Sequence, residues 1–289
     1  MQILTSRADR RARRLYRPLR PWLLCCALVT GACSAGDEHA DPVLSIVSYQ
    51  SVMDLDVSEP AQVLSYGSDP LQFAEFRPAV TGEPAQALIL LVHGGCWLNA
   101  FDLTHARPLA AALASNGYDV WSLEYRRTGD AGGGWPGSLD DVIEGARLLL
   151  DRSSTRPAIL IGHSAGGHLA LLTAERTSVD GVIGLAAITD VTRYASGSNS
   201  CQQATSAFMG GMPAERSAEY AAADLGNRPL NVPVHLLHGE ADEIVPTPHA
   251  GLPGAKSTLQ PGAGHFDWIH PDSAAFATLL AALREMSSP

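Results

Sequence analysis

Residues 158–174 read AILIGHSAGGHLALLTA, and they place Ser164 at the junction of two different patterns. The apolar run 158–161 is typical of a buried strand, whereas the run 168–174 is typical of a helix. A strand that turns sharply into a helix at a serine leaves the hydroxyl exposed at the end of the strand. Small residues such as Gly162 and Gly166 let this turn close. The stretch therefore indicates Ser164 as a candidate nucleophile.

A serine hydroxyl becomes nucleophilic when a base removes its proton and an acid holds that base in the right tautomer. Asp242 lies on the loop after an apolar strand predicted at 234–237, and His265 follows in Gly262-Ala263-Gly264-His265, just before a predicted final helix. The order Ser, Asp, His along the chain is that of one known type of catalytic triad. We therefore predict Asp242 as the acid and His265 as the base.

Two other carboxylates, Glu240 and Glu243, lie beside Asp242 on the same loop. We interpret both as solvated surface charges, because the position of Asp242 after the strand end fits a triad acid better.

A second glycine-rich stretch follows the strand predicted at 87–92 and reads His93-Gly94-Gly95-Cys96-Trp97. Glycines let backbone amides turn toward a shared point, where they can donate hydrogen bonds to a developing negative charge. We therefore predict an oxyanion hole made by the amides of Gly95, Cys96 and Ala165.

Apolar strands alternate with amphipathic helices along most of the chain, after a strand-rich opening over 43–57 and 63–77. This pattern is typical of an α/β fold with a mostly parallel central sheet flanked by helices. The irregular stretch 192–224 is either a small cap over the site or a plain surface loop. The predicted core strands are 87–92, 119–125, 158–162, 182–188 and 234–237, and the predicted helices are 104–116, 138–151 and 273–286.

The N-terminus has the layout of an export signal. Seven arginines and one acid stand in the first twenty residues, and an apolar run over 22–29 leads to small residues at 31–35. We predict an exported bacterial protein with a signal over 1–32, a linker over 33–42 and a single domain over 43–289. Leu28 to Cys33 resembles a lipobox, which favours a lipid anchor on Cys33 over plain periplasmic or secreted protein.

Charge limits the partners that this chain can have. The formal net charge is −10 over 289 residues, and removal of 1–32 takes away seven arginines and one aspartate, which makes it −16. A surface this acidic argues against nucleic acid or anionic lipid as a partner. Membrane contact is then expected only through the lipid anchor, and we expect a small-molecule ester as substrate.

The cysteines and histidines do not have the spacing of a metal site, so we predict no metal and no cofactor. Outside the predicted signal and Cys33, the cysteines are Cys96 and Cys201. They either pair in an oxidising compartment or stay free thiols.

The motifs at 93–97 and 162–168 together resemble those of the α/β-hydrolase group that contains kynurenine formamidases and feruloyl and acetyl xylan esterase-like enzymes. Tyr66-Gly67, Glu124-Tyr125-Arg126 and Trp135-Pro136 add to the resemblance, which covers about 62–287. It implies an α/β-hydrolase fold and an ester or amide hydrolase with Ser164, Asp242 and His265 in the triad.

Cys96 departs from the family pattern, because relatives commonly have an aromatic pocket residue there. A small side chain at this position leaves room for substrate or allows a bond to Cys201. The candidates for the substrate pocket are Trp97, His163 and Trp268.

These residues predict serine-dependent hydrolysis of carboxylic esters through an acyl-enzyme. Two alternatives remain. One is an arylformamidase, and the other is a binding lipoprotein that keeps the fold without the chemistry.

Overall fold

The computed structural model describes residues 46–155, 157–226 and 229–288, which belong to one compact unit bounded by Asp41–Pro289. The predicted signal over 1–32, the linker over 33–42 and Cys33 lie outside the described residues. No helix in the described part of the chain is long and apolar enough to cross a membrane.

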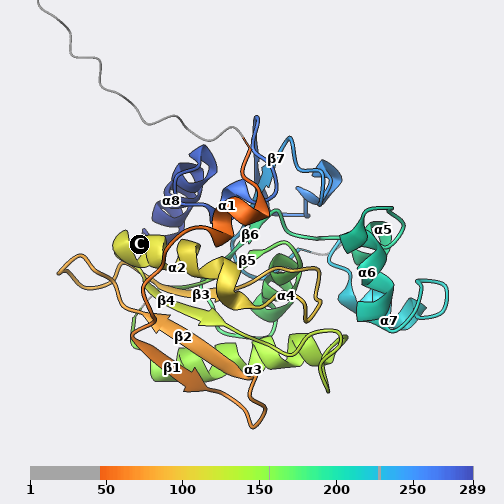
Figure 1. Ribbon diagram of the computed structural model, residues 1–289, viewed down its shortest axis with the longest axis horizontal. Coiled ribbons are helices and arrows are strands. Elements are labelled where there is room, and N and C mark those ends of the chain that lie inside the picture. Colours follow the sequence, from red (N-terminus) through yellow and green to blue (C-terminus); the bar gives the residue numbers. More distant parts are fainter. Residues whose placement is uncertain (1–45, 156, 227–228, 289) are drawn as a thin grey trace, which may run out of the picture. The chain divides into compact units, whose positions relative to one another are not determined.

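An eight-stranded sheet forms the centre of this unit, in the order β1-β2-β4-β3-β5-β6-β7-β8 (Figure 1). The first two strands pair antiparallel with their neighbours, and the pairs from β4 to β8 are parallel. The mostly parallel sheet that the sequence predicted is therefore confirmed. The strands are Gln62–Ser65 (β1), Phe73–Arg77 (β2), Leu88–Val92 (β3), Asp119–Leu123 (β4), Ala158–His163 (β5), Gly181–Leu185 (β6), Val234–Gly239 (β7) and Lys256–Gln260 (β8).

Helices cover both faces of the sheet, which is why its central strands are apolar on both sides. On β3, Leu88 and Leu90 face the core that includes α3 and α4, whereas Ile89 and Leu91 face the core that includes α2 and α8. The helices are Tyr49–Met53 (α1), Arg107–Ser115 (α2), Gly137–Arg152 (α3), Ala165–Ala174 (α4), Val191–Tyr194 (α5), Ser200–Met209 (α6), Ser217–Ala223 (α7) and Ala274–Ser287 (α8), with short 3-10 turns at Leu103–Ala106 (η1), Thr247–His249 (η2) and Asp267–Ile269 (η3).

Three sequence-based expectations differ from the structure. The opening over 43–57 contains helix α1, which begins after Ser48 because that side chain caps it by accepting from the amide of Ser51. Strand β8 was not predicted, since it is a mostly exposed edge strand without an apolar run. The irregular stretch 192–224 holds the short helices α5, α6 and α7, which lie together beyond the carboxyl ends of the strands (Figure 1).

Helix α4 is buried along its whole length, and a histidine joins it to the α5–α7 region. The Nε2 of His168 lies 2.9 Å from the carbonyl oxygen of Ala223, at the end of α7. Burial lowers the pKa of His168 from 6.5 to about 4, although its bond to Ala223 acts in the opposite direction. The neutral ring therefore donates a hydrogen bond between the two parts.

We expect this neutral histidine to make stability depend on pH. Between its folded pKa of about 4 and its ordinary value of 6.5, the unfolded chain binds a proton that folded His168 does not. The free energy of unfolding should therefore fall as the pH falls through this window, by up to about 1.4 kcal/mol per pH unit from one such group. In His168→Gln, which keeps a donor and cannot titrate, urea unfolding over this range should show a shallower slope. Equal slopes in the variant and the wild type would contradict this origin.

Candidate active site

Ser164 stands at the tight turn between β5 and α4, and its backbone has φ 54° and ψ −120°. Such positive φ values are costly for a residue with a side chain, and they occur where the surrounding structure enforces them. The two flanking glycines allow the turn. A Cβ on Gly162 would lie 2.3 Å from the carbonyl oxygen of Gly166, and one on Gly166 would lie 2.2 Å from that of His93.

The predicted acid and base are in contact. The Nδ1 of His265 lies 2.8 Å from Oδ2 of Asp242, whose Oδ1 accepts from the amides of Ile244 and Val245, both at 2.8 Å. Burial alone would raise the pKa of Asp242, but the facing His265 and the amide of Val245 hold this pKa below its usual value. An ionised carboxylate of this kind fixes the orientation of the imidazole.

The two carboxylates beside Asp242 differ from it in burial. The side chains of Glu240 and Glu243 are exposed, as the sequence interpretation expected. His238 lies at the end of β7 and its Nε2 is 2.8 Å from the carbonyl oxygen of Val245, so it belongs to the backbone network of the acid loop. Burial lowers the pKa of His238, which leaves the ring neutral and able to donate this bond.

His163 joins the serine turn to the base. Its Nε2 lies 3.0 Å from the carbonyl oxygen of His265, and the two rings are 4.6 Å apart between centroids. Burial, followed by the charge of His265, lowers the pKa of His163 well below its usual value. The neutral ring therefore donates to the backbone of the residue whose side chain Asp242 holds.

The glycine-rich loop after β3 lies against the serine turn. A Cβ on Gly94 would come within 3.2 Å of the Cβ of Ser164, and Gly95 adopts φ 102°, which glycine tolerates best. Cys96 and Trp97 also have positive φ values, 53° and 57°. The predicted oxyanion residues Gly95, Cys96 and Ala165 therefore stand on the two segments that meet at Ser164.

A buried ion network supports this loop, and sequence reasoning did not identify it. The Nε2 of His93 lies 3.0 Å from Oε1 of Glu124, and the guanidinium of Arg127 lies 3.2 Å from the same oxygen. Glu124 also accepts from the amide of Leu103, and the hydroxyl of Tyr125 donates to the carbonyl of His93. Glu124-Tyr125-Arg126 was visible only as a similarity to a family, because the partners are far apart in the sequence.

Glu124 is ionised although it is buried. Burial by itself would raise its pKa, but His93 and Arg127 hold the pKa below the usual value. A buried charge with this many partners is expensive to disturb, so it keeps the backbone on both sides in place.

The three residues predicted to line the substrate pocket are buried in the structure. The exposed fractions of Trp97 and Trp268 are 0%, and that of His163 is 3%. Trp97 stacks on Phe208 of α6 with 4.5 Å between ring centroids. All three therefore lie in the core, and none of them lines the cavity beside His265.

That cavity has a volume of about 550 Å³ and is the open space next to the acid and the base. Three segments line it, namely 46–49, 240–244 and 264–266. Tyr49 and Phe266 provide aromatic surface, with 5.6 Å between their ring centroids. Its described lining includes three carboxylates and no lysine or arginine, so the cavity carries negative charge.

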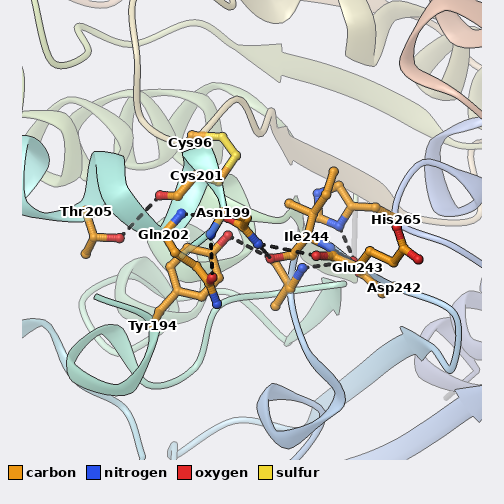
Figure 2. The surroundings of a disulfide bond; sticks show 11 residues. Cys96, Tyr194, Asn199, Cys201, Gln202, Thr205, Asp242, Glu243, Ile244 and His265 are labelled. Carbon is orange, nitrogen blue, oxygen red and sulfur yellow. Dashed lines mark hydrogen bonds and ion pairs between the residues drawn. A yellow bond between two sulfur atoms is a disulfide. The ribbon is translucent and has the colours of Figure 1, made fainter. Parts of the chain in front are cut away.

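Cys96 and Cys201 are joined in a disulfide with 5.1 Å between their Cα atoms, and Figure 2 shows this bond beside Asn199 and Tyr194. The bond connects the glycine-rich loop to helix α6. Within the described residues, no group of three or more His, Cys, Asp or Glu side chains is placed to hold a metal ion.

Two curated proteins align with parts of the chain. It is 24% identical over 179 residues to the uncharacterized protein YfhR of Escherichia coli (strain K12), which covers 61% of this chain and 60% of that protein. It is 39% identical over 114 residues to versiconal hemiacetal acetate esterase of Aspergillus parasiticus, which covers 35% of this chain and 33% of that protein. The chain therefore spans about 60% and a third of the length of these relatives.

The fold is shared with solved structures. Esterase B from Lactobacillus rhamnosis superposes with a TM-score of 0.64 at 20% identity, over 80% of this chain and 87% of that one. This likeness and the sheet topology confirm the α/β-hydrolase fold that the sequence predicted. The family model BD-FAE matches residues 76–252, more than half of the chain, and the protein belongs to this family.

Proposed function

We propose that this protein hydrolyses carboxylic esters through an acyl-enzyme on Ser164. The observation that carries the proposal is the contact between His265 and the buried carboxylate of Asp242 at 2.8 Å. Asp242 lies on the loop after β7 and His265 on the loop after β8 of the central sheet. Family membership supports it, and so does the likeness to proteins that are named as esterases.

In the proposed reaction, the Nε2 of His265 removes the proton of the Ser164 hydroxyl as the oxygen attacks the ester carbonyl. The amides of Gly95, Cys96 and Ala165 donate to the oxygen that becomes negative, and each such donor typically contributes on the order of 3 kcal/mol. His265 then gives its proton to the leaving alcohol. Water, activated by the same ring, breaks the acyl bond and regenerates the serine.

The first test removes the nucleophile. Ser164→Ala should lower kcat for a short p-nitrophenyl ester by at least about 10⁴-fold, because water cannot replace the covalent step. A fluorophosphonate probe should label the wild type and leave the variant unlabelled. Wild-type turnover in the variant would contradict the proposal, and a folded wild type that is neither labelled nor active would favour the binding-protein alternative.

A second test identifies the acid among its neighbours. Asp242→Asn should lower kcat on the order of 10³- to 10⁴-fold, since an amide no longer selects the required tautomer of His265. Glu240→Gln and Glu243→Gln should stay within about threefold of the wild type on the same uncharged ester. A larger loss in either glutamate variant than in Asp242→Asn would assign the acid differently.

The charge of the cavity suggests a preference among esters. Glu240 and Glu243 line it with Asp242, and two exposed charges about 4 Å apart interact by roughly 1 kcal/mol in water. At low salt, kcat/KM for 4-(trimethylammonio)phenyl acetate should exceed that for 4-carboxyphenyl acetate by about tenfold. The ratio should shrink in 0.5 M salt and in the double variant Glu240→Gln/Glu243→Gln. A ratio near one in the wild type would show that this cavity does not receive the alcohol part.

A further inference from the structure

The start of helix α6 has contacts that its own folding does not require. Asn199 caps the helix by accepting from the amide of Gln202 at 2.9 Å, and Gln202 accepts from the amide of Asn199 in return. The capping box uses the side-chain oxygen of Asn199 and leaves its Nδ2 available. That nitrogen donates to the carbonyl oxygens of Ile244 at 2.9 Å and Glu243 at 3.3 Å, both on the acid loop (Figure 2).

The carbonyl and the amide of Ile244 form hydrogen bonds with different partners. The amide donates to Oδ1 of Asp242 at 2.8 Å, whereas the carbonyl accepts from Asn199 and from the hydroxyl of Tyr194 at 3.1 Å. The peptide of Ile244, whose amide orients the carboxylate of Asp242, is thus held at its carbonyl by residues of the α5–α6 region. Loss of the contact from Asn199 would leave the peptide of Ile244 less restrained against the carboxylate of Asp242.

Two residues further along the same helix, Cys201 is bonded to Cys96 of the glycine-rich loop. Cys96 and Trp97 have positive φ values that residues with side chains rarely adopt, so this loop needs support from outside. The disulfide provides it on one side, and the stacking of Trp97 on Phe208 of α6 provides it on the other.

We propose that the segment 199–201 is a positioning element that holds the acid loop and the glycine-rich loop at the same time, with Asn199 as its positioning residue. This inference rests on the proposed ester hydrolysis, in which Asp242 orients the base His265 while the loop amides donate to the oxygen of the reacting carbonyl. Displacement of catalytic groups by about 1 Å can cost as much as 10²-fold in rate. A helix that holds both loops sets their relative position as well as the position of each.

Asn199→Ser separates this role from helix capping. Serine is as good an N-cap as asparagine, but its side chain has no second polar group to reach the carbonyls of residues 243 and 244. We expect kcat for a short uncharged ester to fall by about tenfold while KM stays within about twofold and Tm within a few degrees. Ala207→Ser, which places a serine at an exposed position of the same helix, is the matched control and should retain wild-type kinetics.

The disulfide tests whether the two loops are coupled. Replacing both cysteines, as Cys96→Ser/Cys201→Ser, should lower kcat by about tenfold or more. In that background helix α6 is no longer bonded to the glycine-rich loop. Asn199→Ser should therefore lower kcat by less than about threefold more. An unchanged kcat in Asn199→Ser with the disulfide intact, or the same tenfold loss in both backgrounds, would overturn the proposal.

Hydrogen exchange gives a readout that is independent of catalysis and of the cysteine variants. Amides of residues 242–245 should exchange faster in Asn199→Ser than in the wild type, while strand β5 stays equally protected. Unchanged exchange in the acid loop would overturn the positioning role. A wild type without ester turnover would instead contradict the proposed function, and the exchange experiment would still decide the role of Asn199.

Discussion

The contact between the start of α4 and the loop after β3 is the constraint on which the site depends. Parallel strands β3 and β5 are neighbours, paired from Leu88↔Ala158 to Val92↔Gly162, so the loops that follow them begin side by side. The loops can touch only where side chains are missing, because a Cβ on Gly166 would lie 2.2 Å from the carbonyl oxygen of His93. This close approach brings Ser164 against the glycine-rich loop.

The buried titratable groups around the site differ in charge, because some are ionised carboxylates and others are neutral imidazoles. Asp242 and Glu124 are carboxylates whose partners keep them ionised in spite of burial. His163 and His238 are kept neutral by burial, and each donates from Nε2 to a backbone carbonyl. A neutral ring in such a place is a rigid donor without the cost of a buried charge. His265 thus lies between an ionised carboxylate, Asp242, and a neutral imidazole, His163.

The sequence predicted the parts of this molecule whose signals are local. Strands β3 and β5 are apolar runs buried on both faces, and Ser164, Asp242 and His265 follow the ends of β5, β7 and β8. Strand β8 lacked such a signal because it is an exposed edge, and helix α1 depends on a single cap at Ser48.

The hydrogen bond between Asn199 and Ile244 joins residues 45 positions apart, and the one between His93 and Glu124 joins residues 31 positions apart. Hydrogen bonds between residues so far apart depend on the fold, and the spacing of residues in the sequence does not predict them. For the same reason the aromatic residues near the motifs were misassigned to the pocket. Trp97 belongs to the loop that lies against Ser164, yet its ring is buried and stacks on Phe208 of α6.

The stretch over 192–224 illustrates how a segment without a sequence pattern can still be held firmly. Its helices are short, and α5 and α7 have fewer than two full turns of hydrogen bonds, so they contribute little stability of their own. Their order comes from ties to the rest of the unit: His168 to Ala223 and Tyr194 to Ile244, together with the disulfide of α6. Ties at three separate places oppose a hinge motion about any one of them. The region is therefore held in place through the same two loops that its own contacts hold, the acid loop and the glycine-rich loop.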